Sequence, residues 1–155
     1  MSSGIASPAD PGPRTDLESM PSFLLSHIVH EYQRGLQSRL KAAGCSPLKM
    51  RIVLSLRSYG RMTVGDLCNF AIAEQPTMSR ALDSLEGQGL VRREHSKTDS
   101  RLRLVSLTES GIGLCERIYP EFIRLNAMMT DGMAETDRAD FIGRLRGVLN
   151  NLRRI

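Results

Sequence analysis

The chain has 155 residues, of which 41% are hydrophobic and 25% are charged, and this length and composition fit one globular domain with its own core. No stretch approaches the roughly 18 apolar residues of a membrane span, and the N-terminus lacks the basic, apolar and small-residue regions of a secretory signal. We therefore expect a cytoplasmic protein. The formal net charge of +4 allows an anionic partner without requiring one.

Residues 1–16 are rich in Ser, Pro, Gly and Ala, and such a segment buries too little apolar surface to offset the entropy of ordering it. We predict a disordered arm at 1–16 and a single domain over 17–155. From Phe23 to Leu40 apolar residues recur at helical spacing, and the following Gly44 is typical of a helix end.

Two capped helices are predicted next. In the segment CSPLKMRIVLSL, Ser46 has the position of an N-cap, Pro47 that of the first helical residue, and Cys45 that of a hydrophobic residue packing against Met50. In TVGDLCNF, Thr63 and the acid three residues later have the spacing of a capped start, which predicts a short third helix.

The segment QPTMSRALDSLEGQG predicts a fourth helix that begins near Pro76 and ends at Gly87 or Gly89. Its residues divide into two faces. The apolar stripe contains Met78, Ala81, Leu82 and Leu85, and the opposite face carries Pro76, Thr77, Arg80, Asp83 and Ser84.

Two β-like runs, LVRREH and RLRLVSL, flank the polar segment SKTDS, which predicts a hairpin. The polar and apolar alternation slips at Leu104 and Val105, where we expect a twist or bulge. The order of helices followed by a hairpin indicates a mainly α fold with a small β-hairpin wing, the winged helix-turn-helix, whose later helix enters the major groove of DNA.

Most of the net charge lies in the wing. Five basic and two acidic residues fall between Arg92 and Arg103, so this segment holds +3 of the chain's +4. Asp99 lies between Lys97 and Arg101. Because fixing a free arginine in a groove costs about 1.5–2 kcal/mol of rotamer freedom, we predict that Asp99 holds the Arg101 side chain ready for a narrow minor groove. The alternative is an exposed ion pair of negligible energy.

Thr108 predicts the N-cap of a long helix that Pro120 kinks, and a last helix follows it. The first and last helices have broader apolar faces than a small winged module can cover, and such faces usually mark an interface. The predicted interface residues are Leu25, Ile28, Leu36, Phe122, Phe141, Leu145 and Leu152.

The run from Thr63 to Gly111 resembles the MarR (multiple antibiotic resistance regulator) family of bacterial transcription factors. The similarity lies in the pair Ser79-Arg80, in LEGQGLVRR, in the wing motif Asp99-x-Arg101 and in LTESG, and it continues weakly over residues 20 to 155. The resemblance implies a homodimeric regulator, more commonly a repressor, that presents two winged modules to a pseudo-palindromic duplex. It places the winged module at about 46–108 and the dimerisation helices at about 20–44 and 109–155.

The resemblance also implies a small aromatic or phenolic effector, bound between the dimerisation helices and the winged module. We expect base-edge contacts from Gln75 or Thr77 to be less secure than phosphate contacts, because Asp83 and Glu86 outweigh Arg80 on the recognition helix. The predicted DNA-binding residues are Gln75, Thr77, Ser79, Arg80, Ser84, Arg92, Lys97, Asp99, Arg101 and Arg103. The candidate effector site consists of His30, Met50, Arg51 and Leu54.

Other classes of function are disfavoured. The sequence has no Gly-rich phosphate loop, nucleophile elbow or metal-ligand cluster, so we predict neither an enzyme nor a cofactor. Cys45, Cys68 and Cys115 show no Cys-x-x-Cys spacing and are expected to be buried free thiols. A regulator sensing oxidants through Cys68 or Cys115 remains one alternative, and a winged module that binds proteins without binding DNA is another.

Overall fold

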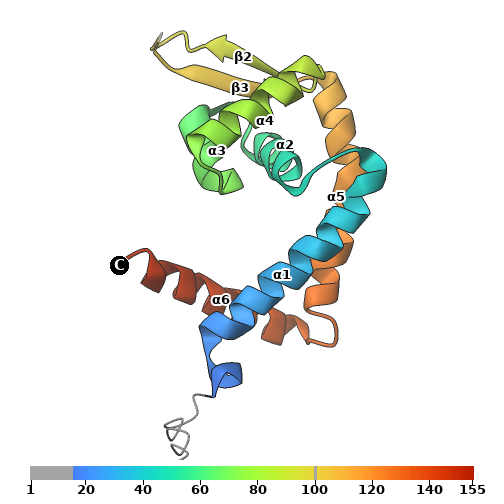
Figure 1. The fold of residues 1–155 in the computed structure, drawn as a ribbon, viewed down its shortest axis with the longest axis vertical. Helices are drawn as coiled ribbons and strands as arrows, with labels where there is room; N and C mark the ends of the chain where they lie inside the picture. The colour runs from blue at the N-terminus through green and yellow to red at the C-terminus, as the bar shows by residue number, and fades with distance from the viewer. Residues whose placement is uncertain (1–15, 100) are drawn as a thin grey trace, which may run out of the picture.

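The computed structural model describes residues 16–99 and 101–155; the arm predicted at 1–16 falls almost wholly outside this range. The long helix α5 runs from a compact lobe at one end toward α6 at the other, and α1 packs against α5 (Figure 1). No helix within the described residues is long and apolar enough to span a bilayer. The elements are α1 (Pro21–Leu40), α2 (Pro47–Tyr59), β1 (Met62–Thr63), α3 (Val64–Ala71), α4 (Gln75–Gly87), β2 (Val91–His95), β3 (Arg103–Leu107), α5 (Glu109–Met129) and α6 (Glu135–Leu152), with short 3-10 turns at Leu17–Ser19 and Lys41–Ala43.

Side-chain caps begin three of the helices, as the sequence predicts. The hydroxyl of Ser46 accepts a hydrogen bond from the Lys49 amide at 3.2 Å, and that of Thr63 accepts one from the Asp66 amide at 3.1 Å. Thr108 caps α5 in the same way. Each cap satisfies a helical N–H that would otherwise lack a partner, which is worth about 1 kcal/mol.

The three strands form an antiparallel sheet in the order β1-β3-β2. The two-residue β1, which the sequence analysis missed, pairs Met62 with Val105 and Thr63 with Leu104. The predicted bulge at Leu104 and Val105 is wrong, because β2 and β3 pair in regular one-to-one register from Val91 and Leu107 to His95 and Arg103. β3 is the middle strand and is covered on both edges. Its adjacent apolar residues Leu104 and Val105 therefore fit a regular strand, and no extra residue is needed to explain them.

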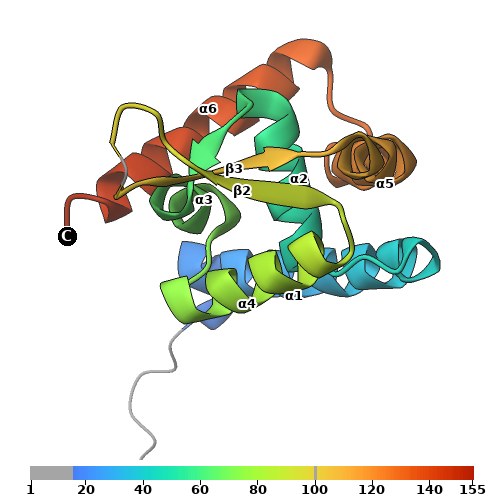
Figure 2. The same ribbon diagram turned by 90° about the horizontal axis from the view of Figure 1, so that it is seen from above.

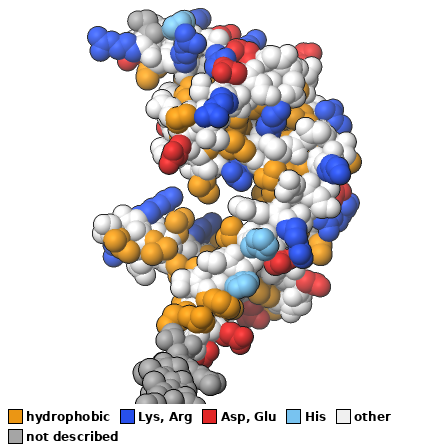
Figure 3. All heavy atoms as spheres, in the orientation of Figure 1, with side chains coloured by type: hydrophobic (Ala, Val, Ile, Leu, Met, Phe, Trp, Pro, Cys, Tyr) orange, Lys and Arg blue, Asp and Glu red, His pale blue; other side chains and the backbone are white. Residues whose placement is uncertain are grey.

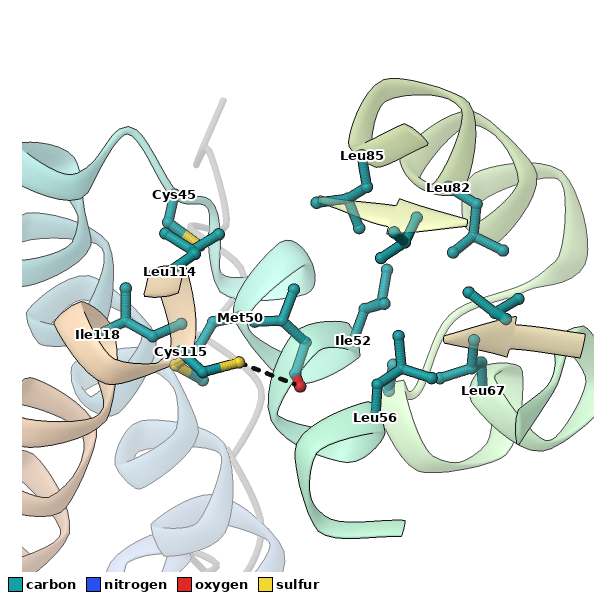
Figure 4. Close-up of a cluster of buried hydrophobic side chains, with 14 of the residues drawn as sticks. Cys45, Met50, Ile52, Leu56, Leu67, Leu82, Leu85, Leu114, Cys115 and Ile118 are labelled. Atoms are coloured by element: carbon teal, nitrogen blue, oxygen red, sulfur yellow. Dashed lines mark hydrogen bonds between the residues drawn. The ribbon is translucent and has the colours of Figure 1, made fainter. Parts of the chain in front are cut away.

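One hydrophobic core joins the lobe to the long helix. In Figure 4, α2 lies in the middle, with Leu67, Leu82 and Leu85 on one side and Leu114 and Ile118 of α5 on the other. The predicted stripe of α4 is confirmed, since Met78, Leu82 and Leu85 are all fully buried and Ala81 packs against them. We call residues 46–108, which hold α2, α3, α4 and the sheet, the winged lobe.

In contrast, α6 has no buried residue although it is 18 residues long. Five of its aliphatic side chains are between 38% and 58% exposed, while Phe141 is half-buried, and apolar residues of α1 are similarly open. Figure 3 shows hydrophobic side chains gathered on this half of the molecule and Lys and Arg side chains gathered at the wing. Leu36, predicted at an interface, is 1% exposed in the chain's own core. The exposed apolar residues here include Leu24, Ile28, Val29, Ile142, Leu145, Val148, Leu149 and Leu152.

Candidate nucleic-acid interface

The helix α4 presents a polar face to solvent. Its buried residues hold it against the lobe, and this fixes which side chains point away from the core. The hydroxyl of Ser84 also accepts a hydrogen bond from Gln88 at 2.9 Å, so it is engaged at the helix end. All five of the α4 residues predicted to contact DNA are exposed: Gln75, Thr77, Ser79, Arg80 and Ser84.

A groove of about 420 Å³ separates α4 from the wing. Seen from above, the hairpin crosses over α2 and α3, with α4 along one side and α5 at the other end (Figure 2). Four of the predicted residues, Gln75, Ser79, Arg101 and Arg103, line this groove together with the start of α3. The remaining predicted residues lie outside it: Thr77, Arg80, Ser84, Arg92, Lys97 and Asp99.

The turn of the wing is fixed by Asp99, although not in the predicted way. Its carboxylate accepts a hydrogen bond from the backbone N–H of Arg101 at 2.9 Å, and its carbonyl accepts one from the Leu102 N–H at 3.0 Å. In the described residues it forms no ion pair with the Arg101 guanidinium, so that part of the prediction is wrong. An aspartate two residues before an amide forms such a turn locally, which leaves the guanidinium exposed and able to contact a ligand.

A second basic residue, Arg93, connects the wing to α4. Its Nε donates to Glu86 at 2.9 Å, its Nη2 donates to Glu86 and to Asp83, and its backbone N–H donates to Glu86 at 3.1 Å. These bonds lower the pKa of Glu86 and raise that of Arg93. Sequence reasoning missed this contact, because it crosses from a helix to a strand and depends on how the two elements pack.

The pairing changes the electrostatics of α4. The sequence analysis set Asp83 and Glu86 against Arg80, but both acids bind Arg93 from the strand. The neighbouring Arg92 points elsewhere, donating to the Ser106 hydroxyl at 3.2 Å and lying 3.5 Å from Glu94. The two carboxylates of α4 are therefore both paired with the guanidinium of Arg93 on the wing.

A separate apolar cavity of about 380 Å³ lies between α1, α2, α3 and α5. Met50, Arg51 and Leu54 line it as predicted, and Arg51 Nε donates to the carbonyl of Ala71 at 2.6 Å. His30 lies outside the cavity, on an exposed part of α1, because it is half a helical turn away from Tyr32, which lines it. The aromatic lining consists of Tyr32, Tyr59, Phe70, Tyr119 and Phe122.

The cysteines are free thiols, as predicted, but only two are buried. Cys115 donates to the carbonyl of Val53 at 3.4 Å, and burial raises its pKa. Burial also raises the pKa of Cys45 to about 11. Cys68 is partly exposed. A thiol whose pKa is raised is a weak nucleophile at neutral pH, so Cys45 and Cys115 have little thiolate character.

Known proteins share this architecture and sequence pattern. The family model described as the MarR family matches residues 46–102. A MarR-family transcriptional regulator from Silicibacter pomeroyi is 34% identical, with a TM-score of 0.79 over 87% of this chain and 91% of that one. A mutant MarR of E. coli complexed with operator DNA is 25% identical, with a TM-score of 0.73 over 85% of this chain and 96% of that one. YwaE, an HTH-type transcriptional regulator of Bacillus subtilis, is 29% identical over 65% of this chain but only 59% of its own length, which is less than two thirds.

Proposed function

Because the chain belongs to the MarR family of transcriptional regulators, we propose that it acts in the cytoplasm as a homodimeric repressor that binds a pseudo-palindromic DNA operator and performs no catalytic step. The observation that carries this proposal is the groove that brings Gln75, Ser79, Arg101 and Arg103 together between α4 and the wing. Polar and cationic side chains of this kind read base edges and phosphates in DNA.

Each lobe engages one half of the operator. The helix α4 enters the major groove with its exposed face, where the Gln75 amide is suited to adenine and Arg80 to a phosphate. The wing lies along the flanking backbone, and Arg101 reaches into the minor groove, whose negative potential attracts a guanidinium. Arg92, Lys97 and Arg103 add phosphate contacts that are independent of sequence.

The second copy covers the apolar faces of α1 and α6. Large apolar side chains such as Ile28, Leu145 and Leu152 are exposed along these two helices, and exposed apolar faces usually mark an interface. Phe141 lies beside a groove of about 290 Å³ between α5 and α6, which an apolar helix can fill. We expect the substitution of Leu145 by Glu to give monomers in sedimentation analysis, whereas an unchanged dimer would contradict this arrangement.

The effector is an aromatic acid or phenol that binds the cavity between the lobe and the long helices. Five aromatic side chains suit a flat ring, and Arg51 at the wall suits an anionic group. A coupling of about 1–3 kcal/mol between the two sites would change DNA affinity some 5- to 150-fold. Titrating a protein–duplex complex with aromatic acids tests this, and release that Arg51→Met does not affect would place the effector elsewhere.

Selection of bound sequences from a pool of random duplexes is the test of the function itself. We expect two inverted half-sites whose centres lie about 10–10.5 base pairs, or a multiple of that, apart. We also expect affinity to fall steeply with salt, because phosphate contacts release counterions. A pool that shows no enrichment, even in dilute buffer, would leave a protein-binding winged module as the better account.

A further inference from the structure

We propose that Arg93 is a positioning residue for DNA recognition: it ties the wing to α4 and keeps the two acids of α4 turned away from the DNA. This inference rests on the proposed function, because it concerns how the same surface is held in shape. Arg93 itself need not contact DNA. Its effect passes through Asp83 and Glu86.

The geometry is that of a clamp. Arg93 binds Asp83 and Glu86, which lie on successive turns of α4, and its own backbone N–H also donates to Glu86. β2 is an edge strand, so this amide would otherwise face solvent without a partner in the sheet. The Arg93 side chain is only 18% exposed. Its planar, multidentate donors fix both distance and orientation, which a lysine cannot do.

The charges explain why such a clamp matters on this surface. Asp83 and Glu86 carry two negative charges on the helix that we propose enters the major groove, and Arg93 lies in the wall of the adjoining groove. Without Arg93 the two carboxylates would be free to turn toward the phosphates. Repulsion between like charges across an interface costs affinity and register.

Arg92 and Arg93 divide two tasks between them. Successive residues of a strand point to opposite faces, and the Arg92 side chain is 57% exposed whereas Arg93 is 18% exposed. Arg92 is thus suited to a phosphate contact and Arg93 to holding α4. Because side chains alternate along a strand, these two adjacent arginines can serve both roles.

A role in positioning and a role in charge alone predict opposite effects for the same substitution. Glu86→Gln removes a negative charge from the helix that we propose enters the major groove, so net charge alone would make binding tighter. If Arg93 positions α4 through Glu86, the same change weakens binding to the preferred sequence. Arg93→Lys also separates the positioning role from the effect of charge. It keeps the positive charge but loses the several hydrogen bonds that the guanidinium donates to Asp83 and Glu86.

The experiment uses the full chain, a duplex recovered from the random pool by the unaltered protein, and a scrambled duplex of equal length. We expect Glu86→Gln and Arg93→Lys each to weaken binding to the selected duplex by about tenfold, while binding to the scrambled duplex stays equal or becomes tighter. Glu116→Gln on α5 serves as the matched control, since it removes the same charge from an exposed site outside the interface. It measures the effect of net charge alone.

Three outcomes overturn the inference. In the first, Glu86→Gln binds the selected duplex as tightly as Glu116→Gln does, which would reduce the effect to net charge. In the second, Arg93→Lys keeps the full ratio of selected to scrambled binding, which would remove the need for multiple bonds. In the third, both variants lose binding to the two duplexes in parallel with a lower melting temperature, which would indicate a role in folding only. If the unaltered chain recovers no preferred duplex, the proposed function fails rather than the clamp.

Discussion

The carboxylate of Asp99 accepts a hydrogen bond from the backbone N–H of Arg101 at 2.9 Å. Asp99 therefore fixes the backbone of this basic loop and does not hold the guanidinium of Arg101. The carbonyl of Asp99 also accepts from Leu102, so one residue closes the turn through both its side chain and its backbone. The exposed Arg101 side chain therefore extends from a backbone that these two hydrogen bonds hold in place.

Two substitutions of Asp99 separate its turn from its charge. Asp99→Asn removes the charge but keeps an oxygen that can accept from the Arg101 N–H, so we expect DNA affinity equal to or above that of the unaltered chain. Asp99→Ala removes the acceptor as well, and we expect it to bind about 3- to 10-fold more weakly than Asp99→Asn. Fluorescence anisotropy with a labelled duplex measures both. Equal affinities for the two variants would refute the role in the turn.

Gly111 is required where α5 meets the winged lobe. A Cβ at this position would lie 2.0 Å from the carbonyl oxygen of Leu90, which already accepts a hydrogen bond from the Thr108 N–H at 3.1 Å. We expect Gly111→Ala to lower the free energy of unfolding by about 3 kcal/mol or more. Gly113→Ala, two residues along the same helix, would meet only the end of the Arg117 side chain at 3.7 Å and should be neutral or stabilising. Denaturant titration compares them, and similar losses for both would contradict this reading.

Ile72 ends α3 in a conformation that is costly for its side chain. Its φ of 53° is left-handed, and the residue is 80% exposed. A β-branched residue is strained there, whereas Asn tolerates it. We expect Ile72→Asn to raise the free energy of unfolding by about 1 kcal/mol, and Ile72→Val, which keeps the branch at Cβ, to give no gain. A loss of stability in the Asn variant would instead mean that the isoleucine is covered in the assembled protein.

The buried thiol of Cys45 makes stability depend on alkaline pH. Its pKa in the folded chain is about 11, above the ordinary value of 9.0, so the fold favours the protonated thiol. The corresponding stability is fully present below pH 9 and is lost as the pH rises from about 9 to 11, by about 2–3 kcal/mol in all. Unfolding measured across this range in the parent and in Cys45→Ala tests it. The difference between them should shrink at high pH, and a constant difference would exclude Cys45 as the source.

Local features of this fold could be read from the sequence. Ser46, Thr63 and Thr108 cap their helices through residues only three positions away, and the buried stripe of α4 follows from helical periodicity. A cap or a stripe is a short-range pattern, so its residues carry enough information.

Contacts between elements could not be read in the same way. The strand β1 contains two residues, too few to show any alternation. Placing Arg93 against Asp83 requires the angle at which the hairpin packs on α4, and placing His30 away from the apolar cavity requires the rotation of α1 relative to α2. The groove itself was anticipated only in part, because four of ten predicted residues line it and Arg93 was missing from the set.

The bonds from Arg93 to α4 tie the hairpin to the helix, so we expect these two elements to move together. The spacing between the two elements that we propose contact DNA would then stay the same when an effector binds. We therefore expect an effector to act by changing the angle of the long helix α5, which joins the winged lobe to α6. A small rotation at its base would displace both elements together and withdraw them from their grooves at the same moment.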